Sequence, residues 1–201
     1  MRVSTGLVVL TVGCLVPFTA SADEPRQHDG GFFLRLAPAF GYASSTITDN
    51  VDEVKISGPA GAFDIALGAA LSPNFIVHAN VGAWAAVDPT LQINGIDFDT
   101  DDLTASIAMF GVGVTYYVGP SNVYLTGSIG LARLSAEFDN ETSNTDLGFA
   151  VEAAVGKEWW VGRRWAIGVG GVINYHSVPD SDIDENWKGA SFGVRLTATM
   201  N

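Results

Sequence analysis

The fold is decided by residues 147–178, which read LGFAVEAAVGKEWWV (147–161), GRR (162–164) and WAIGVGGVINYHSV (165–178). In both long arms large apolar residues alternate with small ones, and this period of two is typical of a β-strand. Each arm continues for more than ten residues, whereas soluble strands are usually about 5–6 residues long and a strand that crosses a bilayer needs roughly 9–11. The stretch therefore predicts a hairpin of two long strands.

The two faces of this hairpin indicate its surroundings. One face carries large apolar residues, and the other is mostly Gly and Ala with a few polar groups. A soluble barrel would need many charged residues toward water, whereas in a membrane barrel the large residues face lipid and the small ones fill a narrow interior. Trp159, Trp160 and Trp165 gather at the turn, and indole rings favour the membrane–water boundary. We therefore expect a transmembrane β-barrel, with a soluble periplasmic barrel as the alternative fold.

The N-terminus has the pattern of a secretory signal peptide. Arg2 gives a positive start, residues 6–18 are apolar, and Ala20-Ser21-Ala22 is a small-residue cleavage site. The single cysteine, Cys14, lies inside the apolar run, so we expect no disulfide in the mature chain. We divide the chain into a signal peptide at 1–22, a periplasmic lead-in at 23–30 and one barrel domain at 31–201.

The composition fits a barrel exposed to lipid. Hydrophobic residues make up 47% of the chain and charged residues only 16%, which is low for a soluble domain. No stretch reaches the roughly 18 consecutive apolar residues of a membrane-spanning helix. The formal net charge is −12, and such an acidic chain is not suited to neutralising phosphates. We therefore expect no nucleic-acid partner.

The alternation predicts eight strands in all. Tight turns near residues 73, 120 and 163 alternate with longer polar loops at 44–58, 88–102, 139–146 and 179–186, which is the layout of outer-membrane barrels. The predicted strands span residues 32–43, 61–71, 75–85, 103–118, 123–138, 147–161, 165–178 and 188–200.

Three positions interrupt the regular pattern. In the fourth and fifth strands the apolar residues change from one face to the other near Met109 and near Ala132, and a β-bulge would produce such a slip. In the first strand Pro38 cannot donate to a ladder. We therefore predict a bulge at each of the first two positions, and a bulge or a missing hydrogen bond at Pro38.

Several segments carry a family resemblance over residues 32–201. They are GFFLRLAPAFGY (31–42), VGKEWWVG (155–162), RRWAIGVGG (163–171) and KGASFGV (188–194). With them the chain resembles the small eight-stranded outer-membrane barrels of the OmpA/OmpX-like superfamily. The resemblance implies an all-β fold, an eight-stranded antiparallel up-and-down transmembrane β-barrel in a Gram-negative outer membrane. It also implies insertion by the barrel assembly machinery, which reads the last strand.

The resemblance leaves the function open, because this superfamily includes anchors, adhesins, narrow channels and lipid-modifying enzymes. An eight-stranded barrel has an interior that side chains roughly fill. The alternation places five charges inside, and we expect them to form one buried network that plugs the lumen; the alternative is a narrow channel for small or hydrophobic solutes. The five predicted lumen charges are Arg35, Asp64, Glu152, Glu158 and Arg195.

Aromatic residues concentrate near the short turns. Amphipathic rings at this level would form a girdle at the membrane–water boundary. The predicted girdle residues are Tyr116, Tyr117, Tyr124, Trp159, Trp160 and Trp165.

The long loops hold most of the 22 acidic residues. Asp97, Asp99 and Asp101 have an alternate spacing that can present oxygens to calcium, and so do residues 180, 182 and 184. Neither run has the Gly and Glu of an EF-hand loop, so we expect solvated loops and neither a metal nor a cofactor. Divalent-ion bridging to lipopolysaccharide stays open as an alternative.

His176 and Ser177 suggest a hydrolase, but adjacent strand residues point to opposite faces. His78 lies toward the other end of a distant strand, so no nucleophile, base and orienting group come together. We therefore expect no enzyme activity and no catalytic residue. The expected role is structural or surface-interacting, in a monomer whose partners are outer-membrane lipid and lipopolysaccharide.

Overall fold

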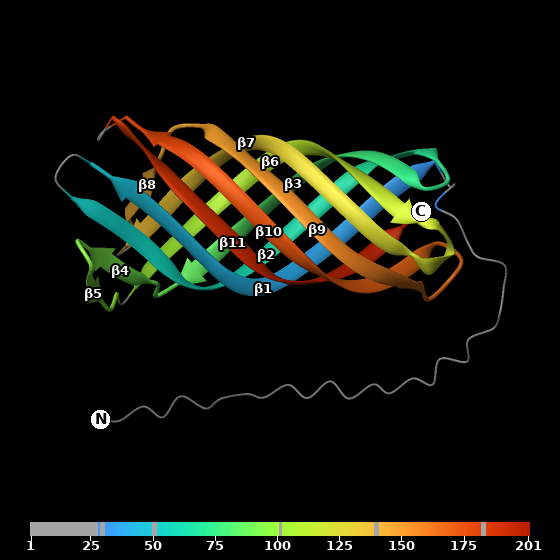
Figure 1. Cartoon of the computed structure of the whole chain (residues 1–201), viewed down its shortest axis with the longest axis horizontal. Helices are drawn as coiled ribbons and strands as arrows, with labels where there is room; N and C mark the ends of the chain where they lie inside the picture. The colour runs from blue at the N-terminus through green and yellow to red at the C-terminus, as the bar shows by residue number, and fades with distance from the viewer. Residues whose placement is uncertain (1–27, 29–30, 50–51, 101, 139–140, 182–183) are drawn as a thin grey trace, which may run out of the picture.

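The protein is an antiparallel β-barrel (Figure 1). The computed structural model describes residues 28, 31–49, 52–100, 102–138, 141–181 and 184–201. The signal peptide predicted at 1–22 lies outside the described residues, and so does the lead-in at 23–30 except for His28. In the described part of the chain no helix is long and apolar enough to cross a membrane.

Eight long strands form the wall, and each pairs antiparallel with its neighbours along the chain. The first strand also pairs with the last, from Leu34 opposite Met200 to Thr46 opposite Lys188, which closes the barrel. The predicted eight-stranded up-and-down barrel is therefore confirmed. The wall strands are β1 (Phe32–Thr48), β2 (Glu53–Ser72), β3 (Phe75–Val87), β6 (Leu103–Val118), β7 (Val123–Phe138), β9 (Gly148–Trp160), β10 (Trp165–Asp180) and β11 (Glu185–Met200).

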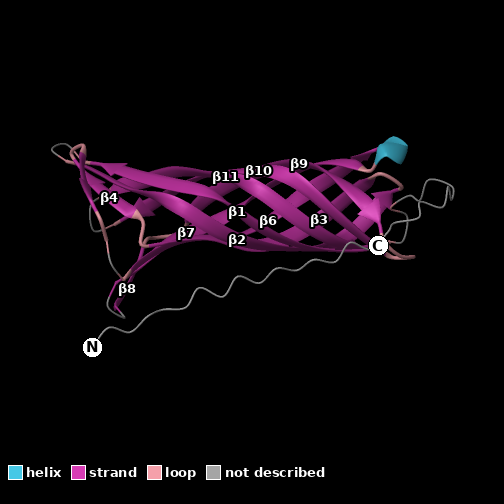
Figure 2. Ribbon diagram, turned by 90° about the horizontal axis from the view of Figure 1, so that it is seen from below, coloured by secondary structure: helices cyan, strands magenta, loops and turns pink. Residues whose placement is uncertain are grey.

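The two ends of the barrel differ. One end holds the C-terminus and the short turns, among them a single 3-10 turn, η1 (Gly119–Ser121), which ends at Asn122 with a φ of 52°. The other end carries three short strands (Figures 1 and 2). Because short turns face the periplasm in outer-membrane barrels, the end with the short strands is the outer end. These strands are β4 (Thr90–Ile93), β5 (Ile96–Phe98) and β8 (Glu141–Asn144).

Two predicted loops are largely strand. The loop predicted at 44–58 is a continuation of β1 and β2, which pair as far as Thr48 opposite Glu53. The loop predicted at 88–102 contains the β4–β5 hairpin, which pairs with the outer end of β2. Asn94 and Gly95 form its turn with φ values of 51° and 81°, and an Asn-Gly pair favours this two-residue turn.

The two predicted bulges are wrong. Strands β6 and β7 pair in one unbroken register from Leu103 opposite Phe138 to Val118 opposite Val123. Met109 and Ala132 are therefore ordinary members of this ladder, and both side chains are buried inside the barrel. The apolar residues change face along these strands because their surroundings change, as the site geometry below shows.

The prediction at Pro38 is confirmed as a missing pair. In the ladder between β1 and β11 the pairing runs from Leu36 opposite Ala198 to Ala39 opposite Arg195, and Ala37 and Pro38 take no part. The register is the same on both sides of this gap, so there is no bulge. Pro38 lacks the N–H that the ladder needs.

Candidate functional site

The periplasmic half of the lumen is filled by a network centred on Arg35. Its side chain is 1% exposed. Nη2 donates to the Tyr117 hydroxyl at 2.8 Å, and Nε donates to Thr199 Oγ1 at 3.3 Å. The same Nε lies 3.5 Å from Glu158 Oε1, which makes an ion pair. The residues come from β1, β6, β9 and β11, so the network crosses the lumen.

Glu158 has a hydrogen-bond donor at each carboxylate oxygen. Tyr117 donates to Oε2 at 2.8 Å and Thr199 donates to Oε1 at 2.8 Å. A buried carboxylate is stable only when it is paired and hydrogen-bonded, and Glu158 meets both conditions. Gly168 on β10 leaves the space for it, because a Cβ there would lie 2.5 Å from Glu158 Cγ.

Aromatic rings surround the Arg35 guanidinium and close this end of the barrel. The Arg35 Cζ atom lies 4.5 Å from the centroid of the Tyr124 ring and 5.1 Å from that of Phe33. His28 stacks on Tyr117 with 3.5 Å between ring centroids and is 1% exposed. Its backbone N–H donates to the Pro73 carbonyl at 3.1 Å. The periplasmic mouth is therefore blocked by stacked rings.

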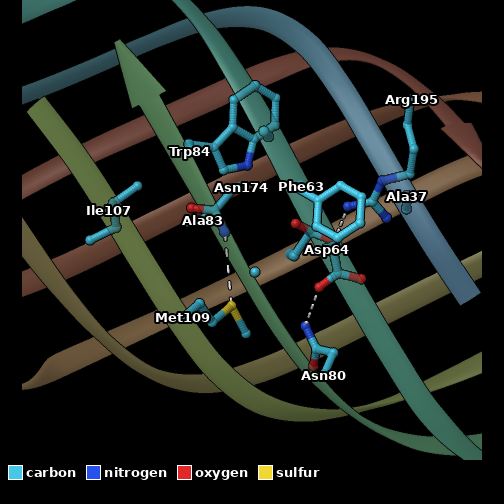
Figure 3. A pocket seen from close by; sticks show the side chains of 13 residues that line it. Ala37, Phe63, Asp64, Asn80, Ala83, Trp84, Ile107, Met109, Asn174 and Arg195 are labelled. Atoms are coloured by element: carbon cyan, nitrogen blue, oxygen red, sulfur yellow. Dashed lines mark hydrogen bonds and ion pairs between the residues drawn. The ribbon is translucent and has the colours of Figure 1, made fainter. Parts of the chain in front are cut away.

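A second ion pair lies near the middle of the lumen, where Arg195 Nη2 donates to Glu152 Oε1. Close to it, Asp64 accepts a hydrogen bond of 3.0 Å from the Asn80 amide (Figure 3). The five predicted charges are therefore all inside, but direct contacts do not join them into one network. Arg35 pairs with Glu158, Arg195 pairs with Glu152, and Asp64 bonds to Asn80.

The outer part of the lumen is apolar on one side and polar on the other. Trp84, Ile107, Met109 and Leu134 are all buried there on the β3, β6 and β7 side of the barrel. The opposite side, formed by β1, β10 and β11, carries polar groups. These groups include His176, whose Nε2 lies 2.8 Å from Ser45 Oγ.

The Ser45–His176 contact was missed by sequence reasoning. The two residues are 131 positions apart in the sequence and meet only because β1 pairs with β11. No local sequence motif therefore predicts their contact. The pair is not a catalytic triad, because no described residue bonds to His176 Nδ1 and a base needs an orienting group.

The outer face of the wall changes in the opposite sense. From residues 32 to 42 the residues of β1 that face outward are large and apolar, and Phe40 is 69% exposed. Farther out on the same strand they are Ser44, Thr46 and Thr48. Outward residues of β6 and β7 follow the same rule, with Phe110 near the middle of the barrel but Thr104 and Arg133 toward the outer end.

We call the described residues within 44–58, 84–109, 132–147 and 176–189 the outer segment, and the rest of the wall the membrane segment. In the membrane segment apolar residues face out and polar groups lie inside, as a lipid environment requires. In the outer segment polar residues mostly face out and apolar residues lie inside, as water requires. The reversal marks the level at which the barrel leaves the hydrocarbon.

At the outer end the apolar face of the short strands is partly exposed to solvent. In the β4–β5 hairpin Ile93, Ile96 and Phe98 are 36%, 62% and 47% exposed. Asp97 lies on the opposite face, where it accepts a hydrogen bond of 2.6 Å from Gln92. Among the described strands β5 pairs with β4 alone, so one edge of it is open there.

Three of the six residues predicted for the girdle face outward. Tyr116, Trp159 and Trp165 point outward and are 48%, 49% and 39% exposed. Tyr117 and Tyr124 are fully buried in the lumen network, so their assignment to the girdle is wrong.

Trp160 is also misassigned, since its ring lies 4.9 Å from that of buried His28. Neighbouring strand residues face opposite sides, so Tyr116 and Tyr117, or Trp159 and Trp160, cannot both meet lipid. The two Asp-rich runs include Asp101 and Asp182, which lie outside the described residues, so solvated loops stay a prediction there.

A closed eight-stranded barrel with an apolar outer band and a polar interior defines a transmembrane barrel of the bacterial outer membrane. The model of the outer membrane protein beta-barrel domain matches residues 7–198, and the chain belongs to this family. The family confirms the predicted location in the bacterial outer membrane. No curated protein matches the sequence.

Several solved structures are similar. Neisserial surface protein A is 15% identical with a TM-score of 0.50, and the match covers 83% of this chain and 96% of that one. OprG from Pseudomonas aeruginosa is 10% identical with a TM-score of 0.49, covering 88% and 99%. Ail, the attachment invasion locus protein of Yersinia pestis, is 11% identical with a TM-score of 0.40, covering 81% and 97%. At these identities the likeness to Neisserial surface protein A supports the fold alone.

Proposed function

We propose that the protein is a non-conducting barrel of the outer membrane whose outer segment is a surface-interaction module. The observation that carries the proposal is the reversal of polarity along β1, β6 and β7. A barrel that served only as an anchor would need no strands beyond the lipid. Here the strands continue outward with polar outer faces and partly exposed apolar inner faces, which favours a role outside the membrane.

The lumen favours a plug over the alternative, a narrow channel. The Arg35 network and the rings around it fill the periplasmic half. Two lumen cavities, near Asp64 and near Ser45, have volumes of only about 10 Å³ and 20 Å³. Each is close to the volume that one water needs. A solute could pass only if the ion pairs separated.

Enzyme activity is not expected. Ser45 and His176 are the two groups that come nearest to a nucleophile and base, but no described residue orients His176 through Nδ1. The cavity beside them has a volume of about 20 Å³, too small for a lipid or peptide substrate.

The partner that fits the outer segment best is cationic and partly apolar. The acids of the outer loops outnumber the bases there, and the β4–β5 hairpin presents Asp97 on one face and the exposed Ile96 and Phe98 on the other. Opposite charge steers encounter and desolvated apolar residues supply affinity. Lipid, lipopolysaccharide and the assembly machinery remain expected partners of the membrane segment, and a monomer remains the expected state.

Conductance and binding measurements test the proposal. In planar bilayers the purified protein should give no steady open conductance, and a steady conductance of nanosiemens would overturn the plug.

In nanodiscs the protein should bind a labelled alternating Lys–Val peptide and not a Glu–Val peptide, with binding that weakens as salt rises. The variant I96S/F98S should lose most of this binding. Val87 is also an exposed apolar residue but lies outside the hairpin, so the control variant Val87→Ser should keep the binding. Equal binding by both variants would overturn the surface-interaction role of the hairpin.

A further inference from the structure

We propose that the lumen holds two ordered water molecules, and that the inner one joins the Arg195–Glu152 pair to Asp64 and Asn80. Buried polar atoms without partners carry the inference. Each such atom costs about 1–3 kcal/mol when it is left unsatisfied. In native proteins these atoms are almost always bonded to protein or to ordered water.

The inner site lies in the middle of the lumen. Arg195 is 3% exposed, Asn80 is 4% exposed and Asn174 is 5% exposed. Arg195 Nε, Asn80 Oδ1 and Asn174 Oδ1 have no hydrogen-bond partner among the described residues. All three side chains line one cavity of about 10 Å³, together with Asp64 and Glu152 (Figure 3). This volume is at the lower limit for one water molecule.

The chemistry of the inner site selects water over a cation. One donor, Arg195 Nε, and two acceptors, Asn80 Oδ1 and Asn174 Oδ1, are unsatisfied. Water accepts one hydrogen bond from the guanidinium and donates one to each amide oxygen, and buried waters typically make about three bonds. A cation would instead be repelled by the guanidinium and would leave the Nε hydrogen without a partner.

The outer site lies beside the Ser45–His176 contact. Its cavity has a volume of about 20 Å³ and is lined by Ser45, Ser57, His176 and Ser191 among others. Ser191 Oγ and His176 Nδ1 have no hydrogen-bond partner in the described part of the chain, and both residues are 1% exposed. A hydroxyl and an imidazole nitrogen can each donate to or accept from a water.

The two sites are neighbours along β10 and β11. Asn174 lines the inner cavity and stands directly opposite Ser191, which lines the outer one. The polar side of the lumen would therefore hold both waters, whereas Trp84, Ile107 and Leu134 make the opposite side apolar. In the Arg35 network, by contrast, Tyr117 and Thr199 make their side-chain hydrogen bonds directly with Arg35 and Glu158.

A crystal structure at high resolution tests the inner site directly. The expected result is a density peak within about 2.7–3.2 Å of Arg195 Nε and of both amide oxygens. An empty cavity would overturn the proposal. So would a peak with six or more oxygen ligands at about 2.3–2.6 Å, which is the geometry of a cation such as calcium.

A double-mutant cycle tests the bridge without a crystal. Asn80 and Asn174 make no hydrogen bond to each other in the described chain, because the Asn80 amide donates to Asp64 and the Asn174 amide donates to Met109 Sδ. The proposed water is therefore the hydrogen-bonded link between them. The unfolding constant of N80A/N174A should depart from the product of the single effects by about twofold or more. The control pair is N174A/T115A, in which Thr115 belongs to the Arg35 network because its Oγ1 accepts a hydrogen bond of 3.4 Å from Arg35 Nη1. The effects of this pair should be multiplicative. Multiplicative behaviour of N80A/N174A as well would overturn the bridge, whatever the surface module binds.

Discussion

The membrane segment and the outer segment are built from the same strands but have opposite interiors. In the membrane segment the lumen holds Arg35, Glu158 and their hydroxyl partners, and the outside is apolar. In the outer segment the lumen holds Trp84, Ile107 and Leu134, and the outside is mostly polar. The difference shows that a strand's alternation has no fixed sense, because the surrounding solvent decides which face must be apolar.

The largest effect is expected at Arg35. Arg35→Met leaves Glu158 as an unpaired buried charge, which should lower the free energy of unfolding by about 3–5 kcal/mol. Arg133→Met removes a guanidinium that faces water in the outer segment, and it should change stability by less than about 0.5 kcal/mol. Urea unfolding in lipid vesicles, followed by tryptophan fluorescence, measures both.

The double variant R35M/E158Q is the control for this prediction. It removes both charges, so it should recover part of the lost stability. If the double variant were as unstable as Arg35→Met, lost packing and not the stranded carboxylate would be the cause.

The next effect tests the level of the hydrocarbon boundary on β6. Phe110 is 64% exposed on the lipid side, and Phe110→Arg should destabilise the barrel by about 2–4 kcal/mol. Thr104 faces outward on the same strand but in the outer segment, and Thr104→Arg should cost less than about 0.5 kcal/mol. Equal costs at the two positions would place lipid around the outer segment and remove the contrast between the segments.

A smaller effect tests the apolar interior of the outer segment on β7. Leu134 is 6% exposed inside the lumen, and Leu134→Ala should leave a cavity that costs about 2 kcal/mol or more. Leu131 is 56% exposed toward lipid, and there an acyl chain fills the space, so Leu131→Ala should cost about 1 kcal/mol or less. The unfolding midpoints of the two variants, measured side by side, test this difference. A larger loss of stability in Leu131→Ala would contradict an apolar interior in the outer segment.

The smallest effect separates two neighbouring tyrosines. Tyr117→Phe removes a hydrogen bond to Glu158 and one from Arg35, and bonds to charged groups are worth about 1.5–3 kcal/mol, so we expect the loss of about 1.5 kcal/mol. Tyr116 is 48% exposed, and Tyr116→Phe should have little effect on stability. Equal losses would return Tyr117 to the boundary girdle.

The architecture was predictable because alternation over long arms, three tight turns and a low charge content all point to one fold. The slips at Met109 and Ala132 were not resolved, since a bulge and a change of solvent give the same apolar pattern. The outward Thr104 and Arg133 were the available signal. The Asn94-Gly95 pair was likewise a hairpin signal inside a predicted loop.

The interior was predictable as a set of charges but not as pairs. Alternation puts Arg35, Glu158 and Arg195 inside, yet the partner of each depends on the stagger between strands that are far apart in the sequence. The same stagger brings Ser45 to His176, and no spacing along the chain could show it.

The unpaired stretch at Ala37 and Pro38 lies in the ladder between the first and the last strand. That ladder forms last when a chain of consecutive hairpins rolls up, because its two strands are the farthest apart in sequence. Because hydrogen bonds are missing in this ladder, we expect the barrel to open between β1 and β11 more easily than between other strands. Amides of β11 near Leu196 should therefore exchange with deuterium sooner than their counterparts in the ladder between β6 and β7, which pairs without interruption.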